Sequence, residues 1–389
     1  MLATERGNIG INAHLLAGET GYRQAGIHQY IAQVLRTLPP QEEGNLRYTI
    51  FTQQGNYLNR PDLLMVPSRW PTERRLARIV WEQFIWPWLA RRHGLDLLHS
   101  MAFVTPLVAP CPAVVTVYDL SFRHYPESFP PGQRWYLQSQ TARSVQQARR
   151  VITISESGRQ DVHHFFNTPL ERIDVVYPGV GDEYRPLPAA TVEQFRRQKG
   201  LPQRFVLHVG TLQPRKNIPV LLEALAQLKE PDVYLVLVGG KGWLFEELFA
   251  RVEALGLQKR VIFTGYVPAE ELPFWYNAAS LLVFPSLYEG FGMPIIEAMA
   301  CGTPVIAADN SSIPEAVGEA GLLFSSQVVE SLVEKLTAVL HSTDLAHTLR
   351  EKGLHQAQNF SWDCAGQQTA ETYYRALGLP YESGTERER

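Results

Sequence analysis

Two glutamates in the stretch LYEGFGMPIIEAMACGTPVIA (287–307) have the side-chain type and the spacing to bind a ligand. Seven residues separate Glu289 from Glu297, and a Gly-x-Gly turn and Pro294 lie between them. Pro294 suits the first position of a helix, where free amide groups attract phosphate, and the glycines let a ligand approach the backbone. Either glutamate alone is better explained as solvated or as a complement to the helix dipole. Together with the turn, they predict a site for a phosphorylated ligand that carries hydroxyl groups.

A pair of cations in HVGTLQPRKNI (208–218) suits a diphosphate. Arg215 and Lys216 follow a predicted strand over 205–210 and precede a helix. An adjacent Arg-Lys pair is more commonly a solvated surface feature. Its position favours a site, because ligands of open α/β sheets bind beyond the carboxyl ends of the strands.

Two residues in the first half are weaker candidates of the same kind. Asp119 ends a predicted strand over 113–119, where it either reaches a ligand or caps a turn. Gly26 opens a helix after a loop and can offer backbone amides to phosphate. A G-x-G-x-x-G fingerprint is absent, and GGKGW (239–243) lacks the spacing of a P-loop.

The elements that position these residues are short apolar runs alternating with amphipathic helical patterns, which is typical of parallel sheets covered on both faces. In the second half, the predicted strands are 205–210, 234–240, 261–265, 280–286 and 303–309, and the predicted helices are 217–229, 243–256 and 294–302. In the first half, the predicted strands are 9–16, 48–52, 95–100, 113–119, 150–155 and 173–178, and the predicted helices lie near 26–37, 72–93, 131–148 and 156–166.

This pattern predicts two doubly wound, Rossmann-like α/β domains with a cleft between them. The stretch GDEYRPLPAA (181–190) is rich in Pro and Gly and is the best candidate for a linker. We therefore expect a first domain over 1–182, a linker over 183–200, a second domain over 201–360, a helix over 361–378 and a frayed tail over 379–389.

Composition excludes several classes of protein. The 389 residues are 45% hydrophobic and 19% charged with a net charge of −3, which argues against nucleic acid as the main partner. Three dispersed cysteines suggest neither disulfides nor a cysteine metal site, and a reduced, cytoplasmic setting fits best. We expect neither a secretory signal nor a membrane span, and the absence of Asp-x-Asp leaves a divalent metal without obvious ligands.

Over nearly its whole length, the chain resembles the retaining nucleotide-sugar glycosyltransferases of family four, which have the GT-B fold. The resemblance rests on the glutamate pair with its neighbours, on VGTLQPRKNI, on GYVPAEEL (265–272) and on AGIHQYI (25–31). The subgroup looks like bacterial mannosyltransferases of polysaccharide assembly, which suggests GDP-mannose as the donor. The resemblance also implies that the first domain binds the acceptor and that the helix over 361–378 crosses back to it.

The resemblance implies a role for each candidate residue. Glu289 would bind hydroxyls of the donor sugar, Glu297 the ribose, and Arg215 and Lys216 the diphosphate leaving group. The remaining donor-binding residues would be Gly26, Gly210, Tyr266, Val267, Phe291, Gly292 and Met293, with Asp119 as a catalytic residue. This chain departs from the family at Tyr118, where a histidine is frequent, and at His28, where a glycine is frequent.

The expected activity is transfer of a hexose, with mannose favoured, from a nucleotide diphosphate sugar to a saccharide or lipid-linked saccharide, with retention and without a metal or other cofactor. The alternatives are a sugar-nucleotide epimerase or phosphorylase of similar fold, and a non-catalytic protein that binds nucleotide sugars. A phosphorylase would need a cofactor lysine, and none is identifiable.

A further expectation concerns RRLARIVWEQFIWPWLARR (74–92), which mixes arginines with Trp81, Trp86 and Trp88. Such a helix either lies at an anionic membrane surface as a peripheral contact or packs its tryptophans in the core.

Overall fold

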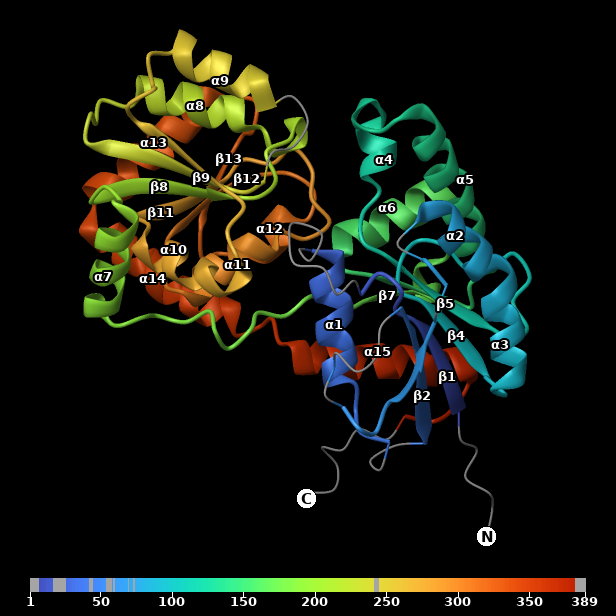
Figure 1. Cartoon of the computed structure of the whole chain (residues 1–389). Helices are drawn as coiled ribbons and strands as arrows, with labels where there is room; N and C mark the ends of the chain where they lie inside the picture. The colour runs from blue at the N-terminus through green and yellow to red at the C-terminus, as the bar shows by residue number, and fades with distance from the viewer. Residues whose placement is uncertain are drawn as a thin grey trace. The chain divides into compact units, whose positions relative to one another are not determined.

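Two parallel sheets organise the chain, each with its own layer of helices on either face (Figure 1). The computed structural model describes residues 7–16, 26–41, 45–53, 58, 60–68, 70–72, 74–240 and 245–381. Unit 1 comprises Met1–Gly179 and Trp362–Arg389, and unit 2 comprises Val180–Ser361. This architecture confirms the predicted pair of doubly wound α/β domains.

The described strands of unit 1 lie in the order β3-β2-β1-β4-β5-β6-β7, all parallel. They are β1 (Gly7–Asn12), β2 (Leu46–Thr52), β3 (Leu64–Pro67), β4 (Leu97–Ser100), β5 (Ala113–Val117), β6 (Arg150–Thr153) and β7 (Ile173–Val175). The helices are α1 (Ile27–Thr37), α2 (Arg75–Val80), the π-helix η2 (Trp81–Ile85), α3 (Trp86–Arg92), α4 (Ser121–His124), η3 (Pro126–Ser128), α5 (Pro131–Gln147), α6 (Glu156–Phe166), η4 (Leu170–Arg172) and α15 (Trp362–Leu377).

The described strands of unit 2 lie in the order β10-β9-β8-β11-β12-β13, also all parallel. They are β8 (Arg204–Val209), β9 (Val233–Val238), β10 (Val261–Gly265), β11 (Leu281–Phe284), β12 (Val305–Ala308) and β13 (Leu322–Phe324). The helices are α7 (Ala189–Lys199), η5 (Pro214–Lys216), α8 (Ile218–Gln227), α9 (Phe245–Ala254), η6 (Ala269–Glu271), α10 (Leu272–Ala278), α11 (Met293–Ala300), α12 (Ile313–Val317), α13 (Val329–His341) and α14 (Thr343–Ala357).

Each sheet has a point at which the order of its strands reverses. In unit 2 the chain runs outward from β8 to β10 and then returns to place β11 beside β8. In unit 1 it runs outward from β1 to β3 and returns to place β4 beside β1. In open α/β sheets, ligands generally bind beside such a point, at the carboxyl edge of the sheet.

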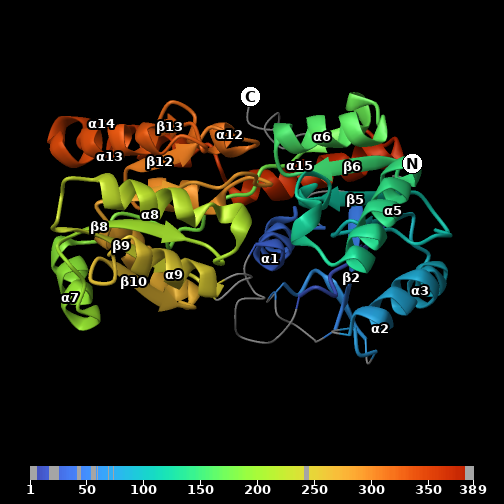
Figure 2. The same cartoon turned by 90° about the horizontal axis from the view of Figure 1, so that it is seen from above.

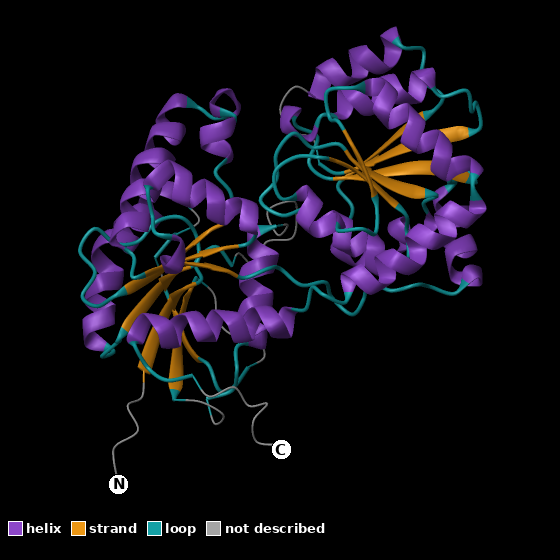
Figure 3. Cartoon of the chain, turned by 180° about the vertical axis from the view of Figure 1, so that it is seen from behind, coloured by secondary structure: helices purple, strands orange, loops and turns teal. Residues whose placement is uncertain are grey.

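Helices cover both faces of each sheet, as the orange and purple layers of Figure 3 show. In unit 2, α8, α9 and α13 pack together on one face, and α7, α10, α11 and α14 pack together on the other. In unit 1, α5 and α6 contribute to a buried cluster with β5 and β6. The opposite face is covered by α1 and α15, which lie against each other in Figures 1 and 2.

The boundary between the units follows Gly179, and residues 189–199 of the predicted linker form the helix α7. Phe195 anchors this helix on α10, with ring centroids 5.4 Å from Phe274 and 5.3 Å from Trp275. This part of the predicted linker can form a helix because residues 189–199 contain neither proline nor glycine. Of the predicted tail 379–389, residues 382–389 lie outside the described residues.

The segment predicted as one helix over 72–93 is α2, η2 and α3 in succession. Pro87 explains the π turn, since it has no amide hydrogen and its ring clashes with the carbonyl four residues earlier. Trp81 and Trp86 are buried in a core cluster and stack with ring centroids 6.0 Å apart, whereas Trp88 is exposed. The core alternative therefore holds for two of the three tryptophans. Among the described residues, no helix is long and apolar enough to cross a membrane.

Candidate functional site

Three charged side chains meet where the strand order of unit 2 reverses. The loop after β8 carries Arg215 and Lys216, and the loop after β11 carries Glu289. Lys216 Nζ donates to Glu289 Oε1 at 2.6 Å, and Arg215 Nη1 lies 2.8 Å from Glu289 Oε2. All three side chains are largely buried. The structure thus brings together the cation pair that sequence position assigned to a diphosphate and one of the two glutamates that their pattern assigned to ligand hydroxyls.

Hydrogen bonds to backbone carbonyls join the two loops that carry this triad. Leu287 N donates to Arg215 O at 2.9 Å, and the Arg215 guanidinium donates to Tyr288 O. From the loop after β12, Ser311 Oγ accepts from Glu289 N at 2.9 Å, and Ser312 Oγ donates to Glu289 O at 2.9 Å. The position of Glu289 is therefore fixed by contacts from both sides.

The pKa of Glu289 is lowered to about 2. Burial alone would raise this pKa, but the charges of Arg215 and Lys216 outweigh it. Beneath the triad, burial and the Lys216 charge lower the pKa of His208 to about 4, so this imidazole is neutral at pH 7. Glu289 is consequently an anion between two cations, and the triad keeps one net positive charge for an anionic ligand.

The loop after β11 turns into α11 at Gly292, where a left-handed backbone is required. Gly292 has φ 113° and ψ 51°, and a Cβ there would lie 3.0 Å from Ile295 Cδ1. Phe291 is buried, and Met293 is the first residue of α11. The helix start is therefore next to the triad, and the helix begins one residue earlier than the first position predicted for Pro294.

Glu297 lies further along α11 and has partners of its own. It is buried, and its Oε2 accepts a hydrogen bond from Tyr276 Oη at 2.7 Å. Burial raises the pKa of Glu297 to about 7, although hydrogen bonds from Tyr276 and Tyr184 oppose the rise. The two glutamates are thus in different electrostatic states, one firmly ionised and one that takes up a proton near neutrality.

The other predicted donor-binding residues of unit 2 lie on the same edge of the sheet. Gly210 follows β8, and a Cβ there would lie 3.3 Å from Lys216 Cε, so glycine makes room for the lysine side chain. Tyr266 and Val267 follow β10, and Tyr266 is exposed.

In unit 1, Asp119 follows β5 and makes the turn contact that one of the two alternatives predicted, while a contact with a ligand stays a prediction. Its Oδ1 accepts from Ser121 N at 2.8 Å at the start of α4, and it also lines a pocket. The neighbouring Tyr118 is buried against Tyr30 and Phe103. Gly26, with φ 65°, precedes α1, whereas residues 17–25 of its loop lie outside the described residues.

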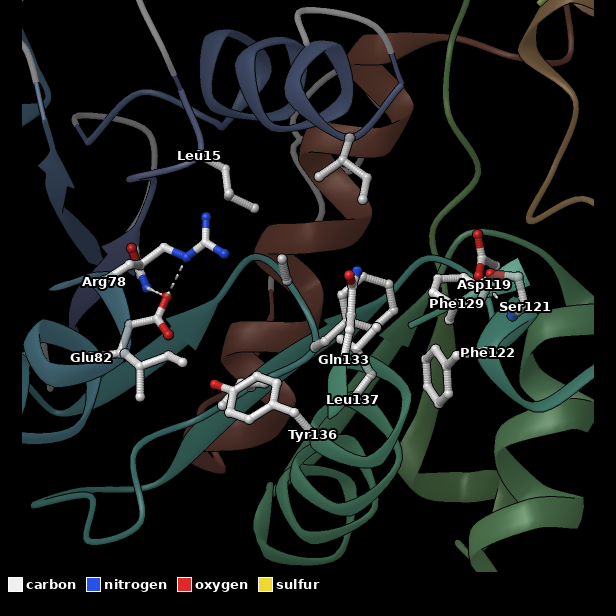
Figure 4. A pocket seen from close by; sticks show the side chains of 16 residues that line it. Leu15, Arg78, Glu82, Asp119, Ser121, Phe122, Phe129, Gln133, Tyr136 and Leu137 are labelled. Atoms are coloured by element: carbon white, nitrogen blue, oxygen red, sulfur yellow. Dashed lines mark hydrogen bonds and ion pairs between the residues drawn. The ribbon is translucent and has the colours of Figure 1, made fainter. Parts of the chain in front are cut away.

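The pocket that contains Asp119 has a volume of about 340 Å³ and lies where the strand order of unit 1 reverses. Figure 4 shows Arg78 and Glu82 on one side of it and Asp119 and Ser121 on the other, with Gln133 and Tyr136 between. Its wall also includes apolar side chains from β-strand loops and α5, among them Leu15, Phe103, Phe129 and Leu137.

A carboxylate held by two neighbours distinguishes one side of this pocket. Asn12 Nδ2 donates to Glu82 Oε1 at 3.3 Å, and Arg78 Nε lies 3.9 Å from the same oxygen. Burial raises the pKa of Glu82 to about 7, against the opposing effects of Arg78 and Asn12. Sequence reasoning missed this group. The only signal was the four-residue spacing of Arg78 and Glu82, which put both on one helix face.

Sequence reasoning also missed Tyr276 and the pair Ser311-Ser312, which hold the two glutamates in place. The serines follow the carboxyl end of the predicted strand over 303–309. Their place after a strand end is the sequence signal that could have identified them. Among the described residues, no group of three or more His, Cys, Asp or Glu side chains is arranged to hold a metal ion.

Comparisons with known proteins match both units. A family model described as "Glycosyl transferases group 1" matches residues 191–356, and one described as "Glycosyltransferase Family 4" matches residues 25–184. O-antigen chain mannosyltransferase B from Escherichia coli is 33% identical over 321 residues, which are 82% of this chain and 81% of that protein.

Solved structures share the fold. Sucrose-phosphate synthase from Thermosynechococcus elongatus aligns with a TM-score of 0.75 at 23% identity, over 96% of this chain and 100% of that one. Anabaena HepE in complex with UDP-glucose aligns with a TM-score of 0.74 at 23% identity, over 95% of this chain and 99% of that one. With its two parallel-sheet units and these neighbours, the chain has the GT-B fold.

Proposed function

The chain belongs to glycosyltransferase family 4, and on this premise we propose that it transfers a mannosyl residue from GDP-mannose, with retention of configuration, to a saccharide or lipid-linked saccharide. Glycosyl transfer follows from family membership. Mannose as the transferred sugar is supported by the similarity to the O-antigen mannosyltransferase.

The observation that carries the proposal is the Arg215–Glu289–Lys216 triad at the strand reversal of unit 2. Cleavage of the sugar–phosphate bond leaves negative charge on the nucleoside diphosphate. Two fixed cations and the free amides at the start of α11 stabilise that charge without rearrangement, and one such preorganised donor contributes roughly 10²–10³ in rate. Glu289 accepts hydrogen bonds from sugar hydroxyls while it holds both cations in position.

The rest of the donor extends along the same edge of the sheet. In this proposal, Glu297 accepts from the ribose hydroxyls, and the backbone at Tyr266 and Val267 borders the base. The amides of Phe291, Gly292 and Met293 hold the sugar and the phosphate. Glu297 already accepts a hydrogen bond from Tyr276. When the ribose binds, Glu297 either accepts from the ribose as well or gives up the bond from Tyr276.

The chemical step balances without a further cofactor. The bond between the anomeric carbon and the phosphate oxygen breaks, and an acceptor hydroxyl forms the new bond on the same face. The hydroxyl proton passes to the departing phosphate oxygen. Metal independence is part of the proposal, since Arg215 and Lys216 supply the positive charge that a metal would otherwise contribute.

The acceptor is proposed to enter the unit 1 pocket that contains Glu82 and Asp119. Its polar groups suit hydroxyls, and its aromatic side chains suit the apolar faces of sugar rings. If so, Glu82→Gln raises KM for the acceptor and leaves the slow hydrolysis of the donor unchanged.

The test is a transfer assay with GDP-, UDP- and ADP-sugars. A thermal-shift screen first identifies the nucleotide, because a ligand at 100 times its Kd stabilises by about 2.7 kcal/mol. NMR of the product made from GDP-mannose then shows an α-mannosidic linkage, and the rate is unchanged by EDTA. A β-linkage in the product contradicts retention of configuration. Loss of activity in EDTA that only added Mg²⁺ or Mn²⁺ restores contradicts metal independence.

Donor incubated without acceptor separates the alternatives. An epimerase would convert the nucleotide sugar under these conditions, whereas a glycosyltransferase hydrolyses it slowly or leaves it intact. A protein that binds nucleotide sugars without catalysis would give the thermal shift and no product with any acceptor.

A further inference from the structure

The continuous segment α2–η2–α3 presents three distinct faces. One face packs in the core through Trp81, Trp86 and Ala90. A second lines the unit 1 pocket through Arg78, Ile79 and Glu82. The third is a row of large apolar side chains that is exposed to a degree unusual for such residues: Leu76 at 78%, Val80 at 43%, Phe84 at 71% and Trp88 at 55%. We call this row the apolar ridge.

The π turn keeps the apolar ridge straight. Each residue of an α-helix advances by 100°, so a four-residue spacing drifts by about 40° per step and by about 120° from Leu76 to Trp88. A π turn contains more residues than an α turn, and η2 lies in the middle of the row. The drift is therefore reduced where it would otherwise carry Phe84 and Trp88 off the common face.

A nearby loop adds to the apolar ridge. Leu107 and Val108 are also exposed, at 52% and 68%. Their loop is bound to the segment, because Leu107 N donates to Gln83 Oε1 at 2.7 Å. The apolar surface thus extends beyond a single helix.

The charges beside the apolar ridge are basic. Arg74, Arg91 and Arg92 are exposed, and the Arg92 guanidinium lies over the Trp88 ring at 5.4 Å. Over residues 74–93, all of them described, Glu82 is the one carboxylate, and it lines the pocket. An apolar face flanked by arginines matches the acyl region and the phosphate headgroups of an anionic bilayer.

We propose that the apolar ridge docks unit 1 onto the surface of an anionic lipid membrane. The segment lies in the plane of the interface with Phe84 and Trp88 inserted, and Arg91 and Arg92 contact the headgroups. Because Arg78 and Glu82 of the same helices line the unit 1 pocket, docking holds that pocket beside the membrane. A saccharide carried on a lipid anchor then reaches the pocket without leaving the bilayer.

Co-flotation with vesicles tests the proposal on the full chain. At low salt, wild-type protein is expected to float with vesicles that contain phosphatidylglycerol. It is not expected to float with vesicles of pure phosphatidylcholine. Phe84→Ser combined with Trp88→Ser is expected to lower partitioning at least 30-fold, because two large apolar side chains no longer enter the interface. Arg91→Ala with Arg92→Ala lowers it by about 30-fold at low salt, at about 1 kcal/mol per basic residue.

The matched control is Phe249→Ser, which removes an exposed aromatic residue of unit 2 and leaves flotation unchanged. All variants retain wild-type transfer to a water-soluble acceptor, so a loss of membrane binding is distinguishable from a failure of the proposed activity. The proposal is overturned if wild-type protein does not float with anionic vesicles, or if the Phe84→Ser/Trp88→Ser variant floats as wild type does. It is also overturned if the ridge instead mediates dimerisation, seen as self-association by ultracentrifugation that the same variant abolishes without any vesicle binding.

Discussion

Glu289 and Glu297 carry the same carboxyl group, and their surroundings move its pKa in opposite directions. Two cations lower the pKa of Glu289, whereas burial beside Tyr276 raises that of Glu297. Environments that separate the pKa values of paired groups usually assign them different tasks. For this chain, we expect Glu289 to act through its charge and Glu297 through its hydrogen bonds.

Lys216→Met tests the charge carried by the triad. We expect kcat to fall by a factor on the order of 10², because a cation is lost where charge develops. We also expect a loss of about 3–5 kcal/mol of stability, since breaking a buried ion pair leaves a carboxylate undercompensated. Denaturant unfolding and steady-state kinetics measure the two effects.

The double variant Lys216→Met/Glu289→Gln separates stability from catalysis. Removing the carboxylate charge as well should recover much of the lost stability, whereas kcat stays low. Wild-type kcat in the Lys216→Met protein would show that this lysine does not stabilise the leaving group.

From the raised pKa of Glu297 we predict how the stability of the protein depends on pH. Its pKa is about 7 in the folded protein against an ordinary value of 4.5, so the folded state holds the proton more tightly than the unfolded chain. Stability contributed by this group is therefore present below pH 4.5 and is lost as the pH rises to about 7, by at most about 3 kcal/mol. Thermal unfolding between pH 5 and 8 should show a larger loss of stability in wild type than in Glu297→Gln, where of these two carboxyl groups Glu82 alone still titrates.

The difference between the two proteins isolates Glu297, because Glu82 titrates identically in both. Glu193→Gln, at a partly exposed position, is the control and should follow wild type. If the unfolding temperatures of wild type and Glu297→Gln changed in parallel between pH 5 and 8, Glu297 would be ionised throughout this range.

At the scale of elements, the connection from β11 to α11 depends on one backbone conformation. Gly292→Ala should cost about 1–2 kcal/mol for the left-handed backbone, with a further cost for displacing Ile295. It should also raise the Kd for the donor, because the helix start moves. Gly256→Ala is the matched control, with φ 66° and open space around its Cβ, and it should cost stability without affecting the donor. If the Gly292→Ala and Gly256→Ala variants had the same Kd for the donor, Gly292 would not contribute to donor binding.

Five of the six described strands of unit 2 could be predicted from the sequence because buried parallel strands are continuous apolar runs; the three-residue strand β13 was not predicted. The predicted strand over 261–265 matches β10, and that over 205–210 differs from β8 by one residue at each end. The meeting of Lys216 and Glu289 was also predictable, since both follow strands at the carboxyl edge of the sheet. Their ion pair was not, because it depends on β8 and β11 being neighbours.

Unit 1 was harder to predict for two physical reasons. The predicted strand over 9–16 ends at Asn12, because its later residues turn away from the sheet. The unit 1 pocket joins Asn12 to Arg78 and Glu82, which are more than 60 residues away and on a helix. Such a contact follows from strand order and helix placement, and neither is encoded in local periodicity.

At the scale of the whole molecule, α15 completes unit 1 although it follows unit 2 in the chain. Tyr373 Oη lies 2.7 Å from His99 Nδ1 of β4, and Arg375 pairs with Asp174 of β7 at 2.6 Å. Helices α1 and α15 approach so closely that a Cβ at Gly366 would lie 2.1 Å from Thr37 O.

Gly366→Ala should therefore destabilise unit 1 by several kcal/mol, because a backbone oxygen cannot move aside cheaply. Hydrogen exchange should show faster opening of β1, β4 and β5, with unit 2 unaffected. Gly132→Ala, with open space around its Cβ, is the control in the same unit. Faster exchange in both units alike would mean that the two are not independent in stability.

The late position of α15 also has a consequence for the order of events on the ribosome. All seven described strands of unit 1 are synthesised before unit 2, yet the helix that covers β4 to β6 is synthesised after it. At typical elongation rates, synthesis of unit 2 takes on the order of tens of seconds. During that interval unit 2 can fold to completion, while the nascent first sheet still exposes His99 and its apolar neighbours. This half-covered sheet is a candidate for chaperone binding, so we expect chaperone demand during translation to be greater for unit 1 than for unit 2.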